Sequence, residues 1–145
     1  MSVELDRLAS AQALEVVTGV VRRLRQAAAA APDPRDRLSL TEIRMLKRLA
    51  GGARHASELA ALLEVTPATV SATVEALVQG GLVRREGPGL DRRAVPLALT
   101  AEGVDALGAA RERQEEALAS LLDRLRPSER RAVRVAIASL ARILG

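Results

Sequence analysis

Four arginines lie close together near the middle of the chain, around a loop of turn-forming residues. Arg84 and Arg85 lie just before residues 87–94 (GPGLDRRA), separated from them by Glu86, and this loop contains Arg92 and Arg93. A guanidinium at the tip of an exposed loop can enter a narrow minor groove of DNA, where the negative potential is deepest. A solvated polar turn is the simpler interpretation of such a loop. The elements that position it decide between the two.

The segment before the loop predicts two short helices joined by a tight turn. The helices span residues 56–63 and 67–79, and three residues connect them, which is the spacing of a helix-turn-helix. Thr66 is a suitable N-cap for the second helix, and Pro67 suits its first position. In this motif the second helix lies in the major groove, with its N-terminal turn nearest the base edges.

The outward face of residues 67–79 carries small side chains, as close approach to a groove requires. Val70, Val74 and Leu77 share the inward face. An ordinary amphipathic helix with small residues toward solvent would show the same pattern, so the helix alone leaves both interpretations open. The adjacent arginines favour DNA. The outward residues are Ala68, Thr69, Ser71, Ala72 and Glu75.

The remaining pattern predicts a mainly α fold with a small two-stranded β-wing. Ser39 and Glu42 form a capping box at the start of a helix that ends at Gly51–Gly52. Further helices are expected over residues 4–31, from Thr100 to about Leu125, and from Pro127 to Leu144; the strands are expected over 82–86 and 95–99. The apolar stripe of the helix after Thr100 is Val104, Leu107, Leu118, Leu121 and Leu125, and that of the last helix is Val133, Ile137, Leu140 and Leu144.

Composition excludes several classes of function. The 145 residues include no Cys, Phe, Tyr or Trp and carry a formal net charge of +4. Disulfides, thiolate catalysis, a Cys-ligated zinc and base stacking on aromatic side chains are therefore excluded. A metal site on His55, the only His, would need carboxylates as co-ligands, and none cluster with it. We find no nucleophile with its base and no phosphate-binding Gly loop, so we expect neither an enzyme nor a cofactor.

The N-terminus has no basic start followed by an apolar run, and no stretch approaches the roughly 20 apolar residues of a membrane span. We therefore expect a cytoplasmic protein, associated with the nucleoid and not with a membrane.

Four segments together resemble the MarR family of winged helix-turn-helix transcriptional regulators. They are residues 40–46 (LTEIRML), 57–71 (SELAALLEVTPATVS), 80–85 (GGLVRR) and 91–103 (DRRAVPLALTAEG), the last being the most specific. The resemblance extends over essentially the whole chain. It implies a single domain, residues 1–145, with a DNA-binding winged helix-turn-helix over 39–100 flanked by dimerisation helices over 4–31 and 100–145.

The resemblance also implies roles for individual residues. Arg93 would insert in the minor groove, and Asp91 would hold the loop or orient that arginine. Many relatives carry Arg or another long polar residue where this chain has Ala72, so thymine methyl contacts, hydroxyls and DNA shape gain weight here. The residues expected to contact DNA are Ser57, Thr66, Ala68, Thr69, Ser71, Ala72, Arg84, Arg92 and Arg93.

The apolar stripes outside the winged helix predict a homodimer. About sixty residues of winged helix cannot cover all of them, and a two-fold dimer is the commonest closed solution. Two recognition helices about 34–36 Å apart would match a pseudo-palindromic operator.

The resemblance implies a repressor released by a small anionic or apolar effector, near Arg44, Lys47, Arg48 and Arg85. Surface or phosphate contacts are the simpler role for these cations. The rival function is a winged-helix protein-interaction module that has lost DNA affinity, an alternative motivated by Ala72.

Overall fold

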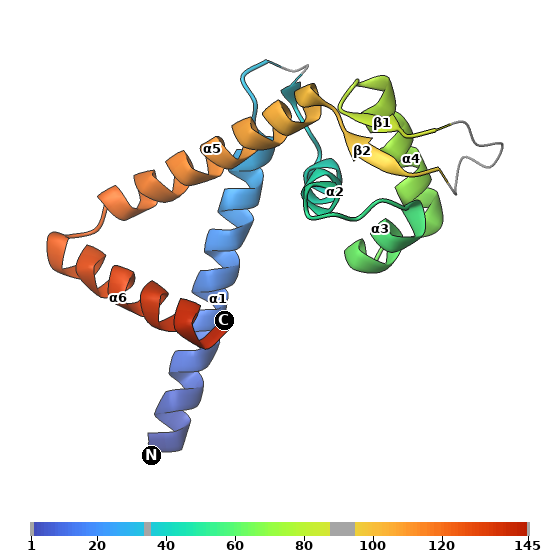
Figure 1. The fold of residues 1–145 in the computed structure, drawn as a ribbon. Coiled ribbons are helices and arrows are strands. Elements are labelled where there is room, and N and C mark those ends of the chain that lie inside the picture. The colour runs from blue at the N-terminus through green and yellow to red at the C-terminus, as the bar shows by residue number, and fades with distance from the viewer. Residues whose placement is uncertain (1, 34–35, 88–94, 145) are drawn as a thin grey trace.

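The computed structural model describes residues 2–33, 36–87 and 95–144, and it confirms the predicted mainly α fold with a two-stranded wing (Figure 1). Among these residues no single helix is long and apolar enough to cross a membrane, although the helices Ala56–Leu63 and Pro67–Gln79 meet both criteria together, as a pair bent by 116°. The elements in order are α1 (Ser2–Ala29), α2 (Leu40–Ala50), α3 (Ala56–Leu63), α4 (Pro67–Gln79), β1 (Val83–Arg85), β2 (Leu97–Leu99), α5 (Ala101–Asp123) and α6 (Pro127–Leu144).

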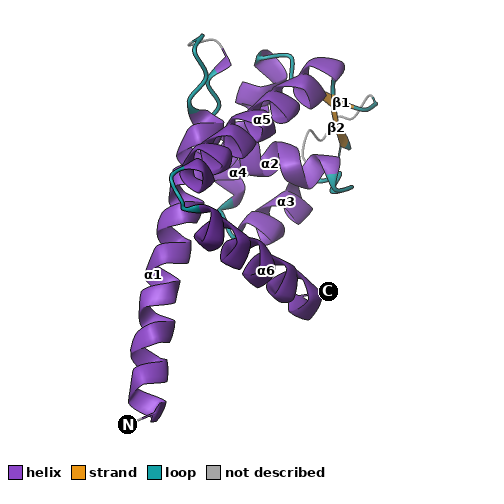
Figure 2. Ribbon diagram, turned by 90° about the vertical axis from the view of Figure 1, so that its left-hand side faces the viewer, coloured by secondary structure: helices purple, strands orange, loops and turns teal. Residues whose placement is uncertain are grey.

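The molecule has a compact body and two projecting arms. Helices α2, α3 and α4 and the β1–β2 ribbon form the body, and α5 leads away from it across the C-terminal part of α1 (Figures 1 and 2). At the crossing, Nη2 and Nε of Arg113 donate to the carbonyl oxygen of Ala28, at 2.7 and 3.2 Å. The N-terminal half of α1 and the whole of α6 extend beyond the body (Figure 2).

Three of the helices begin at an N-cap residue whose side chain is hydrogen-bonded to a backbone amide, as the sequence predicts. Ser39 Oγ accepts from the amide of Glu42 at 3.2 Å, and the Ser39 amide donates to Glu42 Oε2 at 2.6 Å. Thr66 Oγ1 accepts from the Thr69 amide and thereby caps α4. Thr100 caps α5 in the same way. Local chemistry therefore determines where these helices begin.

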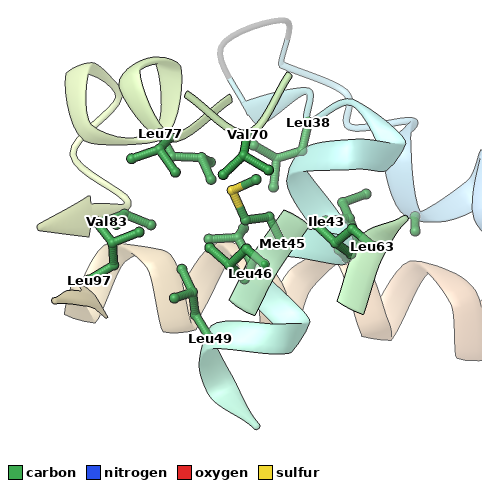
Figure 3. Close-up of a cluster of buried hydrophobic side chains, with 14 residues drawn as sticks. Leu38, Ile43, Met45, Leu46, Leu49, Leu63, Val70, Leu77, Val83 and Leu97 are labelled. Atoms are coloured by element: carbon green, nitrogen blue, oxygen red, sulfur yellow. The ribbon is translucent and has the colours of Figure 1, made fainter. Parts of the chain in front are cut away.

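A core of aliphatic side chains fills the body (Figure 3). Met45 and Leu46 of α2 are fully buried at its centre. Because the chain has no aromatic residue, close packing of Leu, Val, Ile and Met must supply the dispersion and hydrophobic terms. Other core positions include Leu59 and Leu63 of α3, Val70, Val74 and Leu77 of α4, and Val83 and Leu97 of the ribbon.

The wing strands are shorter than the predicted 82–86 and 95–99. Val83 pairs with Leu99, and Arg85 pairs with Leu97, in an antiparallel register. The amide of Leu82 donates instead to the carbonyl of Leu77 at 2.9 Å, so Leu82 closes α4 and does not open β1. Pro96 has no N–H to donate to the ladder, and β2 begins only after it.

Helix α5 begins against the turn that follows α4. Thr100 donates from Oγ1 to the carbonyl of Gly81 at 2.6 Å and from its amide to Leu82 O at 3.1 Å. A Cβ on Gly103 would lie 2.0 Å from the carbonyl oxygen of Leu82, so only glycine permits this approach. The motif L-x-L-T-x-x-G thus has a physical basis at the joint between body and arm.

The first residue of the predicted apolar stripe of α5 is exposed in the single chain. Val104 is 56% exposed, and the buried positions of α5 are Gly103 and Ala110. The reason is the close approach of α5 to the body and to α1, which admits small side chains on the packed face and leaves the larger Val104 outside. In α6 the described residues include no buried one, although its predicted stripe is present in the sequence.

Candidate nucleic-acid interface

Helices α3 and α4 form a helix-turn-helix with a tightly bonded turn. Their axes are bent by 116° across three connecting residues. Glu64 adopts a left-handed conformation (φ 55°), and its amide donates to the carbonyl of Ala61. Thr66 then caps α4. The turn fixes the angle at which the recognition helix α4 leaves the body.

The exposed face of α4 carries small and hydroxyl-bearing side chains. Ala68, Thr69, Ser71 and Ala72 are all exposed, whereas Val70 and Val74 are buried. This agrees with the predicted helix face. Thr66 is exposed too, and its Oγ1 lies 2.9 Å from Oγ1 of Thr69, so these two hydroxyls share a hydrogen bond.

The start of α3 is held by a carboxylate. Oε2 of Glu58 accepts from the amides of Arg54 and His55, both at 2.8 Å. These two hydrogen bonds lower the pKa of the Glu58 carboxyl, and the one from Arg54 has the larger effect. Ser57 lies exposed at this helix start. His55 is the N-cap residue of α3, at the predicted place.

The two arginines of β1 point to opposite sides of the ribbon. Arg84 is 60% exposed, and its Nη2 lies 2.8 Å from Oε1 of Glu86, whose other oxygen lies 3.3 Å from Nη1 of Arg54. Arg85 is 23% exposed and pairs with Glu75 of α4 at 2.9 Å. Strand alternation explains the difference, because Arg85 shares its side with the buried Val83. Asp91, Arg92 and Arg93 lie outside the described residues.

The predicted ligand-binding cations separate into two places. Arg44, Lys47 and Arg48 of α2 line a cavity of about 410 Å³ together with Arg25 of α1. Arg85 lies elsewhere, between α4 and the wing. Arg44 also donates from Nη2 to the carbonyl of Leu63 at 3.0 Å, which ties α2 to the end of α3.

Sequence reasoning missed four participants. Arg25 and Gln114 reach the α2 cavity from α1 and α5, and no local pattern predicts that these helices meet α2 there. Arg54 and Glu75 form ion pairs with the wing. The sequence indicates the outward position of Glu75 on α4 but not its pairing with Arg85, because strand alternation alone does not set the angle between the ribbon and the helix. Among the described residues, no three His, Cys, Asp or Glu side chains gather closely enough to hold a metal ion.

A short supporting helix, an exposed recognition helix with small side chains and a basic antiparallel ribbon define a winged-helix DNA-binding protein. Residues 38–94 match a family model described as the MarR family. No curated protein matches the chain closely in sequence.

Solved structures extend the similarity to nearly the whole chain. A Pseudomonas aeruginosa protein is 28% identical, with 97% of this chain and 96% of that one covered and a TM-score of 0.76. The MarR family protein Rv2887 of Mycobacterium tuberculosis, solved in complex with DNA, is 27% identical over 87% of this chain and 94% of that one, with a TM-score of 0.63. The multiple antibiotic-resistance repressor of Listeria monocytogenes shares the fold at 16% identity, with 99% and 96% covered and a TM-score of 0.75. The winged helix-turn-helix region of this chain therefore matches the MarR family, and the chain as a whole is similar to solved MarR-family DNA-binding transcriptional regulators.

Proposed function

We propose that this protein is a homodimeric repressor that binds a pseudo-palindromic operator in double-stranded DNA and releases it when a small molecule binds. The observation that carries DNA binding is the exposed α4 face of small and hydroxyl side chains beside the basic β1–β2 ribbon. The structure of Rv2887, a relative solved in complex with DNA, supports binding to DNA. Such a non-enzymatic regulator acts in the cytoplasm, at the nucleoid.

The residues divide by the part of DNA that each would contact. Ala68 and Ala72 would meet thymine methyl groups, and Thr69 and Ser71 would donate to base edges in the major groove. Ser57 and Thr66, at the starts of α3 and α4, would contact phosphates, because helix N-termini carry free amides and a positive dipole end. Arg84, Arg92 and Arg93 would follow the backbone and minor groove from the wing, with Asp91 orienting Arg93.

Selection of duplexes from a random pool tests this proposal and identifies the operator. Ala72→Glu should then weaken operator binding by at least roughly tenfold, since one base contact is worth about 1–3 kcal/mol and the new charge faces DNA. Gln12→Glu adds the same charge on an exposed position of α1 and should leave affinity unchanged. Equal affinities for the two variants would contradict α4 as the recognition helix.

A salt titration separates the regulator from a protein-interaction module without DNA affinity. Each phosphate that the protein neutralises adds about −0.9 to the slope of log K against log salt. A steep slope with random duplex is expected for the regulator. A flat slope, with no duplex selected from the pool, would favour the interaction module.

The dimer proposal rests on apolar side chains that the single chain leaves exposed. They lie along the arms, at Leu14, Val17 and Val21 of α1 and at Ile137, Leu140 and Leu144 of α6. Contiguous apolar surface of this kind marks an interface, and a second copy presents the same surface. Sedimentation equilibrium should give a dimer at micromolar concentration, and loss of residues 127–144 should give monomeric or aggregated protein.

The α2 cavity is the proposed effector site. Cations from α1 and α2 line it, and none of its described lining residues is a carboxylate. An anion bound there would contact both an arm and the body, and could therefore bias their relative position. Benzoate and succinate are suitable probes: one or both should raise the melting temperature and weaken operator binding. Lys47→Gln/Arg48→Gln should abolish both effects, while Arg22→Gln, on α1 outside this cavity, should preserve them.

A further inference from the structure

Among the described residues, one ion pair joins the recognition helix to the wing. Arg85 Nη2 of β1 lies 2.9 Å from Glu75 Oε2 of α4. Both side chains line a cavity of about 190 Å³, whose other walls include Ser71 of α4, Ala56 of α3 and Leu97 of β2. The pair therefore lies in the trough between the recognition helix and the wing.

Helix periodicity places Glu75 near the DNA-facing positions of α4. It follows Ser71 by four residues and Ala72 by three, so all three share one side of the helix. A carboxylate on a surface that meets phosphates repels them, and a bare Glu75 would therefore weaken binding. Its presence there therefore needs another explanation, either in the stability of the fold or in DNA binding.

The stability of the fold does not explain it. The side chains of Glu75 and Arg85 are 44% and 23% exposed, and ion pairs that solvent reaches in this way add little to the free energy of unfolding. What the carboxylate does is fix one guanidinium. Arg84, its neighbour in β1, is instead held by Glu86 on the opposite side of the ribbon.

We propose that Glu75 is a positioning residue that holds Arg85 in the trough as a phosphate clamp and sets the wing at its angle to α4. This rests on the proposed DNA binding. With α4 in the major groove and the wing over the adjacent minor groove, the DNA backbone between the two grooves passes along this trough. Arg85 is the described cation that lines it, and its role is then to contact DNA and not an effector.

The test is the sign of the effect of Glu75→Gln on binding to a duplex that the wild-type protein selects from a random pool. Removing a negative charge from the DNA-facing surface should strengthen binding if charge alone matters. The positioning role predicts the opposite: roughly tenfold weaker operator binding, as for loss of one charge-assisted contact, with a salt slope flatter by about one unit. Affinity for a random duplex of the same length should fall less, so the ratio of the two affinities should drop.

The matched control is Glu115→Gln. Glu115 also forms an ion pair at 2.9 Å, with Arg111, but this pair lies on the exposed surface of α5. The Glu115→Gln change should alter neither the affinity for the operator nor the affinity for the random duplex. Arg85→Gln should weaken operator binding as much as Glu75→Gln, and the double variant should be little worse than either, because both remove one unit. Arg85→Gln also tests the pair if Glu75→Gln does not fold.

Unchanged or tighter operator binding by Glu75→Gln, or additive effects in the double variant, would overturn the positioning role. A wild-type protein that selects no duplex would instead overturn the proposed function, and this inference with it. The melting temperatures of all three variants should match that of the wild type.

Discussion

The body and the arms of this molecule bury their apolar side chains in different ways. Among the described residues, every buried Leu, Ile, Val and Met belongs to the segment Leu38–Leu97, the winged helix. In the arms the described buried residues outside this range are small: Ala28, Ala31, Gly103 and Ala110. The Leu, Ile and Val side chains of α6 are half-buried or exposed.

The contrast shows which part of the chain can fold by itself. Burial of a Leu or Val side chain adds about 1.5–3 kcal/mol to the free energy of unfolding, and the side chains of the body are buried by contacts within a single chain. In the arms, Leu14, Val17, Ile137 and Leu140 remain exposed in the single chain. We therefore expect the body to unfold independently of protein concentration and the arms to depend on association.

The largest effect should come from opposite Leu→Ala changes in the two regions. Leu46 is fully buried, so Leu46→Ala should lower the free energy of unfolding of the body by about 2–5 kcal/mol. Leu140 is 56% exposed, so Leu140→Ala should leave that value unchanged but raise the dimer dissociation constant roughly tenfold. Urea denaturation at two protein concentrations and sedimentation measure the two quantities. A large loss of body stability from Leu140→Ala would mean that the regions are not separate.

A smaller effect is expected at the joint between body and arm. Gly103→Ala would place Cβ 2.0 Å from the backbone oxygen of Leu82, and the resulting shift should cost about 3 kcal/mol. Gly108→Ala, on the same helix with no atom within 4 Å, should stabilise by up to about 1 kcal/mol. Thermal denaturation of the pair compares them directly. Similar melting temperatures would show that the contact at Leu82 yields freely.

The crossing of α1 and α5 should be more tolerant. Arg113→Met would leave the carbonyl of Ala28, near the end of α1, without its donor, at a cost of about 1–2 kcal/mol. Arg111→Met removes only an exposed ion pair with Glu115 and should cost less than about 0.5 kcal/mol. Urea denaturation measures both. Equal costs would mean that water replaces the guanidinium at Ala28.

The smallest effects should appear in acid. In the body, hydrogen bonds from the backbone amides of Arg54 and His55 lower the pKa of Glu58. In an arm, hydrogen bonds from Arg126 lower the pKa of Glu129, and the one from the Arg126 side chain has the largest effect. Because the pKa of each carboxylate is lowered in the folded state, the carboxylate makes its full contribution to the free energy of unfolding at pH values above the ordinary glutamate pKa. The contribution is lost as pH falls through the lowered value.

Glu58→Gln and Glu129→Gln should therefore each reduce the loss of stability on acidification, the first in urea unfolding of the body and the second in hydrogen exchange at the start of α6. An unchanged pH profile for either variant would contradict the role of its carboxylate.

Much of the fold follows from short-range chemistry. Ser39, Thr66 and Thr100 bond to backbone amides three residues later, so each helix start depends on neighbouring residues alone. The α3–α4 spacing likewise predicts the helix-turn-helix and its exposed small residues. These features need no knowledge of the rest of the chain.

Tertiary structure decided the remainder, because it brings together residues that no local pattern connects. Leu82 lies in the turn that ends α4 and not in β1, because its amide donates to the carbonyl of Leu77. Val104 lies outside although it belongs to an apolar stripe, since α5 approaches the body closely enough to admit only Gly103.

Arg85 illustrates the division best. Its charge and strand position are evident in the sequence, but its partner Glu75 and its separation from the α2 cations depend on the angle between ribbon and helix. Periodicity is a property of each element by itself, whereas the packing of one element on another sets which side chains meet.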